Sequence, residues 1–326
     1  MAKLYERINW EDLPSKNTPI NAENLNKMDK AIDDLDNKIE EGRSGYLEKN
    51  NPTGTGAFSM NRREATEEYP IGDYSTAEGD SCTASGYSSH AEGYCTTSIH
   101  HSSHAEGHTT VASGLASHAE GTDTIASGSY SHAEGECTTA SGNVSHAEGA
   151  GAKASGLTSH AEGANTIASG SYSHAEGECT TASGSHSHAE GFGAKTIFNN
   201  GNVVYEYKTN AKGLGSHAEG AFTVAGGRAS HAEGEETIAS GDYQHVQGKY
   251  NVEDTNNEFA HIVGGGTSDT DRKNIHTLDW NGNAVFAGDV TNGNGVTMDG
   301  LKTLIEELTT QVQTLTTQLE TLQATS

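Results

Sequence analysis

Small and polar residues alternate along the middle of this chain with a strict period. The pentapeptide Ser-His-Ala-Glu-Gly recurs every 14 residues from His90 to His188, and it resumes at His217 after a step of 29 residues. With one degenerate copy at each end, at Thr76 and His245, the chain holds 12 copies. An Ala-Ser-Gly motif lies between most of them. The unit predicts two short strands and two glycine-bearing turns in every 14 residues.

Side chains on a strand point alternately to its two faces, so the repeat separates into two surfaces. Around His132, the small residues Ser131, Ala133 and Gly135 share one face, while His132 and Glu134 share the other. In Thr-Ile-Ala-Ser-Gly, the Thr, Ala and Gly residues form a second small face. We predict that the small faces close a narrow roll. The histidines and glutamates then form a column outside it, with coils about 4.8 Å apart.

This column takes one histidine and one glutamate from each full repeat. We expect the carboxylates to orient the imidazoles through hydrogen bonds, with simple solvated faces as the alternative. The members of the column are His90, Glu92, His104, Glu106, His118, Glu120, His132, Glu134, His146, Glu148, His160, Glu162, His174, Glu176, His188, Glu190, His217, Glu219, His231 and Glu233.

The two ends of the chain show helical periodicity instead of strand periodicity. Apolar residues near the N-terminus follow 3-4-3-4 spacing, and those at the C-terminus follow an unbroken heptad pattern. Both patterns predict coiled coils. The predicted seams consist of Leu25, Met28, Ile32, Leu35 and Ile39, and of Leu301, Ile305, Leu308, Val312, Leu315, Leu319 and Leu322.

These patterns divide the chain into five parts. From the N-terminus, they are an attachment segment with a short coiled coil (1–42), a connector (43–75), a roll of 12 coils (76–248), a small β domain (249–295) and a coiled coil (296–326). The step of 29 residues hides an insertion, in which an Asn-Asn-Gly-Asn turn predicts a hairpin at about 192–212.

Composition narrows the class of protein. Hydrophobic residues make up 32% of the 326 residues, and 40 residues are glycine. Such a chain cannot fill a conventional globular core, but a repeat shares its core with neighbouring copies. The net charge of −26 excludes general binding to nucleic acid or to anionic membrane surfaces. Because the start is charged and no long apolar run exists, we expect neither a secretion signal nor membrane insertion.

The alternating Ala-Ser-Gly and Ser-His-Ala-Glu-Gly units resemble the head of trimeric adhesins of the YadA type. In that family three left-handed β-rolls pack around a three-fold axis, and the positions that flank the alanine face the other subunits and usually hold Val and Ile. Here these positions hold His and Glu, for example His132 and Glu134. The resemblance therefore implies a mainly β homotrimer, a left-handed parallel β-roll flanked by coiled-coil helices, with the polar ladder at its axis.

Other segments resemble proteins of phages that infect Gram-positive bacteria. The stretch from Ile8 to Ile39 is similar to the virion-attachment segment of their tail-fibre and baseplate proteins. The stretches from Asn50 to Arg62 and from His276 to Val290 also resemble those proteins.

This second resemblance implies a structural fibre of a phage or phage-tail-like particle, assembled in the bacterial cytoplasm. Its N-terminus would dock on a baseplate, tail or other virion protein, and the fibre would attach to a glycan or protein of the bacterial surface. Two alternatives stay open. One is a decoration fibre of the head, neck or baseplate without a receptor, and the other is a fibre-borne glycan depolymerase.

No residue pattern indicates catalysis or a cofactor, and we expect a non-enzymatic protein. Serine precedes each histidine of the repeat, but neighbouring strand residues point to opposite faces. No Gly-x-Ser-x-Gly motif or glycine-rich phosphate loop stands between a strand and a helix. No cysteine pair or His-Glu-x-x-His helix supports a metal site, and we assign none. Coil stacking around a three-fold axis leaves one alternative, a transition metal at one or two levels of the column.

A receptor site should show exposed aromatic side chains, and aromatic residues are only 6% of this chain. The hairpin insertion, two loops of the roll and the 249–295 segment hold the candidates. These are Phe198, Tyr205, Tyr207, Trp280, Tyr130 and Tyr172.

Overall fold

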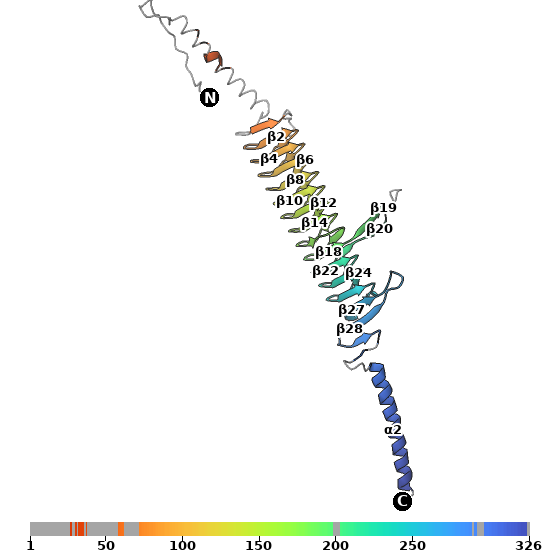
Figure 1. The fold of residues 1–326 in the computed structure, drawn as a ribbon. Coiled ribbons are helices and arrows are strands. Elements are labelled where there is room, and N and C mark those ends of the chain that lie inside the picture. The colour runs from red at the N-terminus through yellow and green to blue at the C-terminus, as the bar shows by residue number, and fades with distance from the viewer. Residues whose placement is uncertain are drawn as a thin grey trace, which may run out of the picture. The chain divides into compact units, whose positions relative to one another are not determined.

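The computed structural model shows a mainly β chain, a parallel β-solenoid of about 13 turns with a C-terminal helix (Figure 1). It forms two compact units, residues 1–159 and 160–326. The structure describes residues 27, 30, 32–35, 37, 58–61, 72–197, 203–288, 290–291 and 297–324, with the backbone alone at 58–61, 194–197 and 203–207.

The N-terminal unit contains two parallel sheets whose strands alternate along the chain. The first sheet runs in the order β1 (Phe58–Asn61), β2 (Thr76–Asp80), β4 (His90–Tyr94), β6 (His104–His108), β8 (His118–Thr122), β10 (His132–Glu136) and β12 (His146–Ala150). The second contains β3 (Thr83–Ala84), β5 (Thr97–Ser98), β7 (Val111–Ala112), β9 (Ile125–Ala126), β11 (Thr139–Ala140) and β13 (Lys153–Ala154). Each coil therefore places one strand in each sheet.

The C-terminal unit repeats this arrangement and then changes it. Its first sheet contains β14 (His160–Ala164), β16 (His174–Ala175), β18 (His188–Phe192), β22 (His217–Ala221), β24 (His231–Glu235), β26 (His245–Lys249), β27 (Phe259–Gly265), β28 (Asn274–Asp279) and β29 (Ala284–Phe286). Its second sheet contains β15 (Ile167–Ala168), β17 (Thr180–Ala182), β21 (Thr209–Ala211), β23 (Val224–Ala225) and β25 (Ile238–Ala239).

Two elements stand outside these sheets. The predicted hairpin is confirmed, because β19 (Ala194–Ile197) and β20 (Val203–Tyr207) pair antiparallel with each other. The insertion leaves the coils in register, since His188 on β18 pairs with His217 on β22. Helix α2 (Met298–Ala324) follows the sheets. The described residues between 27 and 37 are also helical.

The roll interior consists of small side chains stacked in columns. In one coil, Ser131, Ala133, Thr138 and Ala140 are almost completely buried, as the alternation of the repeat predicts. The same positions are buried in the neighbouring coils, and the repeated alanine pairs with the same residue of an adjacent coil, for example Ala133 with Ala119 of the preceding coil. A core of alanine, serine and threonine explains why this chain needs so few hydrophobic residues.

The position of the pentapeptide glycine differs from the predicted one. Gly135 was expected on the small inner face, but it is exposed, with φ at 103°. A Cβ placed on Gly135 would lie 2.1 Å from the carbonyl oxygen of Gly149 in the next coil. Glycine is required here because the backbone turns outward and the coils approach closely, and not because the site faces the interior.

The tight corners of each coil hold left-handed residues that are not glycine. Val144 has φ at 58° and Cys137 has φ at 55°. In each case the amide donates to a carbonyl of the previous coil, from Val144 to Ser129 at 2.8 Å and from Cys137 to Thr122 at 2.9 Å. This ladder of hydrogen bonds fixes a backbone conformation that these residues disfavour in isolation.

The solenoid continues beyond residue 248, where the sequence predicted its end after 12 coils. Strand β27 pairs parallel with β26, and Ile262 lies opposite Val246. Strands β28 and β29 then extend the same sheet in antiparallel order. The predicted small β domain at 249–295 is therefore a continuation of the sheet, and the solenoid has about 13 turns.

Larger side chains fill the interior at this end. Gln244 takes the place of the repeated serine, Val246 that of alanine and Asn251 that of threonine, and all three are buried. The Gln244 amide donates to Oδ2 of Asp254 at 2.9 Å and to the carbonyl oxygen of Phe259 at 3.0 Å. Through these bonds the buried amide of Gln244 and its acceptors on Asp254 and Phe259 are paired inside the last coil.

Candidate functional site

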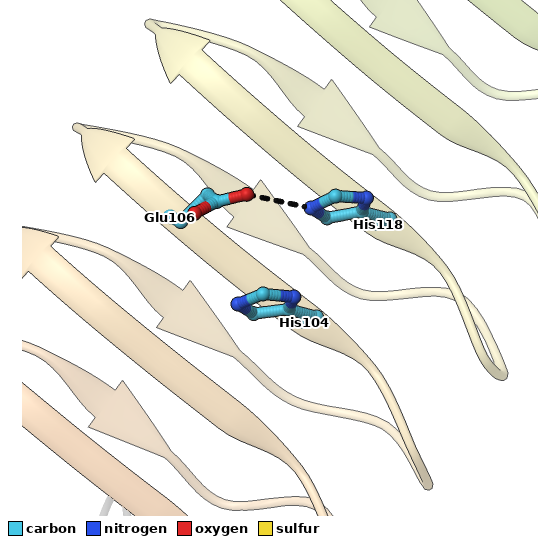
Figure 2. A group of neighbouring side chains, drawn as sticks. All are labelled: His104, Glu106 and His118. Atoms are coloured by element: carbon cyan, nitrogen blue, oxygen red, sulfur yellow. Dashed lines mark hydrogen bonds and ion pairs between the residues drawn. The ribbon is translucent and has the colours of Figure 1, made fainter.

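Within each unit, the first sheet positions the histidines in a stack. His104 begins β6 and His118 begins β8, and the parallel pairing places one directly opposite the other. Their rings are 4.7 Å apart between centroids and are inclined by only 3° (Figure 2). Similar stacking continues within each unit, with centroid separations of 4.8 Å for His118 and His132 and for His188 and His217.

The glutamate of one coil approaches the histidine of the next coil, as Figure 2 shows for Glu106 and His118. The distance from Glu Oε1 to His Nε2 is 3.1 Å in this pair. The corresponding distances are 3.3 Å for Glu120 and His132, 3.1 Å for Glu134 and His146, 3.3 Å for Glu176 and His188, 3.2 Å for Glu190 and His217, 3.5 Å for Glu219 and His231, and 3.4 Å for Glu233 and His245. Close histidine–glutamate contacts between successive coils therefore occur within a single chain.

Other members of the column lie at longer range. His104 Nε2 is 3.9 Å from Glu92 and His174 Nε2 is 3.9 Å from Glu162, while His90 and Glu92 of one coil are 4.0 Å apart. His160 and Glu148 also belong to the column, and both are engaged in interactions. Each unit therefore carries its own part of the column.

The side chains of the column are half-buried within their own chain. The side chain of His118 is 34% exposed and that of Glu106 is 32% exposed. The Nε2 atoms of several column histidines have almost no solvent-accessible area, yet they lack a hydrogen-bond partner of acceptable geometry. These histidines are His90, His104, His132, His174, His231 and His245. Such shielded polar atoms are costly unless something pairs with them.

Burial and neighbouring histidines lower the pKa of two column histidines, His104 and His174. The pKa of His104 is lowered, first by burial and then by the neighbouring His118 and His90. The pKa of His174 is lowered for the same reasons, with burial again the largest cause. These imidazoles are therefore neutral at pH 7 and offer a lone pair at one ring nitrogen.

Two histidines that sequence reasoning missed continue the row of rings, in tilted and edge-on contact instead of stacking. The ring of His261 lies 5.1 Å from that of His245, and His276 follows at 5.4 Å from His261. Burial also lowers the pKa of His261. The His-Ile-Val-Gly pattern at His261 matches the His-Val-Gln-Gly pattern at His245, and this signal could have revealed the extra coil despite the altered spacing.

The serines do not act on the histidines. The hydroxyl of Ser131 is buried inside the roll and donates to the carbonyl oxygen of Gly128 at 2.7 Å. His132, the next residue, points to the opposite face of the strand. The serine before each histidine therefore secures the turn, and it is not placed as a nucleophile.

The predicted receptor residues lie at separate places. Tyr130 is 61% exposed and Tyr172 is 52% exposed, and both sit in corners of the roll with positive φ. The Tyr172 ring stacks on His186 at 4.9 Å. Trp280 is half-exposed, and its Nε1 donates to the carbonyl oxygen of Asn257. Phe198 lies outside the described residues, while Tyr205 and Tyr207 lie on β20, where only the backbone is described.

An aromatic cluster that the sequence did not single out lies in the first described coils. The rings of Tyr74 and Tyr87 are 5.4 Å apart, and the Tyr87 ring is 5.8 Å from that of His101. All three side chains are exposed. They are neighbours because a residue and the one 13 or 14 positions later occupy the same corner of successive coils.

Helix α2 carries its predicted seam on an uncovered surface, and no residue of the helix is buried. Leu308 and Leu315 are each 64% exposed. The remaining seam residues, Leu301, Ile305, Val312, Leu319 and Leu322, are exposed as well. Ile32 and Leu35 of the N-terminal seam are exposed and helical, whereas Leu25, Met28 and Ile39 fall outside the described residues.

Within the described part of the chain, no helix has the length and apolar character needed to span a membrane. No protein-family model matches the chain, and no curated protein matches it either.

Proposed function

We propose that the chain is the subunit of a homotrimeric fibre that belongs to a phage or phage-tail-like particle and attaches to the bacterial surface. The observation that carries this proposal is the uncovered apolar seam of α2. A 27-residue helix with every leucine exposed is not stable alone in water and requires partner helices. Three parallel copies provide them in a coiled coil.

The His–Glu column supports the same assembly. Three left-handed rolls that pack around an axis bring three columns together, and each shielded Nε2 gains carboxylates of the other copies as partners. Polar groups buried in an interface are tolerated only when they are paired in this way. The column then sets the alignment of the copies, because a shift by less than one coil separates the histidines from the glutamates.

The biological role follows from the resemblance of the terminal segments to phage fibre proteins and from the exposed corners of the roll. The N-terminal segment docks on a virion protein, and the roll presents aromatic side chains such as Tyr130 and Tyr172 to a surface glycan or protein. Three copies in each fibre, and several fibres in each particle, raise weak contacts to useful avidity.

Assembly is tested by measuring the mass of the purified chain with light scattering. Three copies of the 34.1-kDa chain give about 102 kDa. We expect the double variant Leu308→Lys, Leu315→Lys to reduce this mass. The matched control Thr310→Lys, Thr317→Lys, on the opposite side of the helix, keeps it. A mass of one chain for the unaltered protein would refute the trimer.

The role of the column in assembly has its own test. We expect His132→Ala or Glu134→Ala to lower the thermal midpoint of the assembly more than Asp123→Asn, because Asp123 lies on an exposed corner outside the column. Equal midpoints for all three variants would show that the column does not form the interface.

Attachment is tested by incubating fluorescently labelled protein with intact Gram-positive cells. We expect saturable binding that weakens several-fold in the variant Tyr130→Ala, Tyr172→Ala. Binding to no cell type would favour a decoration fibre of the head, neck or baseplate. Release of sugar from purified cell-surface glycan would instead identify a depolymerase.

A further inference from the structure

We propose that the His–Glu column binds divalent transition-metal ions of the zinc type. Each ion lies between a glutamate Oε1 of one coil and a histidine Nε2 of the next. The inference rests on the proposed trimer, because a single column cannot complete the coordination shell.

The separations within the column match those between two ligands of one metal ion. Zinc lies about 2.0 to 2.2 Å from histidine nitrogen and carboxylate oxygen, so two such ligands at ordinary coordination angles are about 3.0 to 3.5 Å apart. The Glu106–His118 and Glu134–His146 pairs are separated by 3.1 Å, and the Glu233–His245 pair by 3.4 Å. An ion could replace the shared proton of such a pair without a large movement of either side chain.

The donor atoms favour a transition metal over calcium or magnesium. Imidazole nitrogen with carboxylate oxygen suits zinc, nickel, copper and iron, whereas calcium and magnesium prefer oxygen alone. The Nε2 atoms of His104 and His174 are shielded from water and lack a hydrogen-bond partner, so a ligand there would remove an unsatisfied group.

The stacking distance shows why one chain is not enough. Two nitrogens bound to one zinc ion are at most about 4.2 Å apart, which is twice the metal–nitrogen distance. The rings of His104 and His118 are nearly parallel with centroids 4.7 Å apart, so equivalent nitrogens are separated by a similar distance, and the ligand atoms of His104, Glu106 and His118 lie within 4.8 Å of one another. Each column therefore supplies one histidine and one glutamate to an ion. The partner copies supply the other ligands at the same level.

The same spacing limits the number of ions. Ions at successive levels would be separated by about one coil, or about 4.8 Å, and like charges at that range repel strongly. The hydrogen bonds already differ between successive levels, since His118 and His146 are bonded to Glu106 and Glu134, whereas the Nε2 of His132 lies 3.3 Å from Glu120 without forming a hydrogen bond. We expect ions at alternate levels at most.

The test measures zinc bound to the untagged full-length chain after removal of metal with a chelator. Isothermal titration with zinc chloride gives the affinity, and mass spectrometry of the dialysed protein gives the number of ions per chain. Magnesium chloride is the negative control. The test variant replaces four column histidines with glutamine, at His104, His118, His132 and His146. The control variant replaces four exposed histidines outside the column, at His100, His101, His108 and His186.

We expect the column variant to lose about a third of the bound zinc, since the column holds 11 histidines from His90 to His245. The control variant should lose none. If the histidine variant fails to fold by circular dichroism, the second variant replaces Glu92, Glu106, Glu120 and Glu134 with glutamine, and it should show the same loss. Equal zinc content in column and control variants would overturn the proposal.

Measuring the mass of the assembly by light scattering in the same samples tests the metal site and the trimer independently. A trimer that binds no zinc would refute the metal site and leave the fibre intact. A single chain that binds no zinc would refute both. A single chain that binds zinc through the column would refute the shared ligand set and the trimer.

Discussion

The imidazole rings of His104 and His118 lie face to face, with centroids 4.7 Å apart and planes inclined by 3°. Protonation of His104 would place its charge beside the rings of His90 and His118. The glutamates partly compensate, but burial and the neighbouring histidines outweigh them, and the pKa of His104 is lowered below its usual value of 6.5.

Acid should therefore destabilise the protein. The pKa of His104 and of His174 is lower in the folded chain than the ordinary 6.5, so the unfolded chain binds more protons between these values. The contribution of the two neutral histidines to the free energy of unfolding is fully present above about pH 6.5. It is lost as the pH falls to their pKa in the folded chain. We expect the thermal midpoint to fall between about pH 7.5 and pH 5.5. The variant His104→Gln, His174→Gln should show a shallower fall, and an identical slope would contradict this explanation.

Close approach between coils should make one class of glycine irreplaceable. A Cβ on Gly220 would lie 2.3 Å from the carbonyl oxygen of Gly234, whereas a Cβ on Gly215 meets nothing within 4 Å. Gly215 has φ at 64°, inside the left-handed region that other residues can adopt, whereas Gly220 has φ at 100°, outside it, so backbone strain adds to the difference. We expect Gly220→Ala to cost at least about 3 kcal/mol and Gly215→Ala about 1 kcal/mol. Denaturant unfolding checks this, and equal costs would show that the coils separate easily.

The left-handed corners offer a route to higher stability. Val144 is β-branched and has φ at 58°, a conformation that costs such a residue roughly 1 to 2 kcal/mol. Asparagine tolerates this conformation, and Asn165 adopts it at φ 54° in another coil. We expect Val144→Asn to raise the free energy of unfolding by about 1 kcal/mol and Asn165→Val to lower it by a similar amount. A loss of stability in the first variant would mean that the Val144 side chain makes contacts that outweigh the strain.

The buried threonine hydroxyls should also respond to substitution according to their partners. Thr138 Oγ1 is fully buried and has no hydrogen-bond partner, whereas Thr209 Oγ1 donates to the carbonyl oxygens of Phe192 at 2.9 Å and Gly220 at 3.1 Å. Valine has nearly the same shape without the hydroxyl. We expect Thr138→Val to stabilise the fold by about 1 kcal/mol and Thr209→Val to destabilise it by a similar amount. Calorimetric melting of both variants distinguishes the two cases.

Much of the solenoid could be predicted because its repeat obeys simple steric rules. The period of the pentapeptide defines the coil, and strand alternation identifies Ala133 and Thr138 as interior residues. The exposed position of Gly135 could not be predicted from alternation, since alternation assumes a straight strand and the chain turns there. The left-handed corners at Val144 and Cys137 were also hidden, because local preference opposes that conformation and only the neighbouring coil enforces it.

The sequence predicts which residues form the candidate site, but it does not predict which of them contact one another. The sequence places a histidine and a glutamate on one face of every repeat, but it does not say that Glu106 reaches His118 in the next coil instead of His104 in its own. That choice depends on side-chain length and on the slant of the parallel strands. His261 escaped notice because a longer loop before it changes the spacing of the repeat.

The identical pairing of every coil has a consequence for how such a gene can change. Thr124–Gly142 and Thr166–Gly184 are the same 19 letters, and within each unit Ala133 and Ala175 meet an alanine in a neighbouring coil. A recombination event that removes or adds one such cassette would join two coils that already fit, just as the inserted hairpin left His188 paired with His217. The number of coils can therefore change by whole repeats, while the N-terminal and C-terminal segments stay the same.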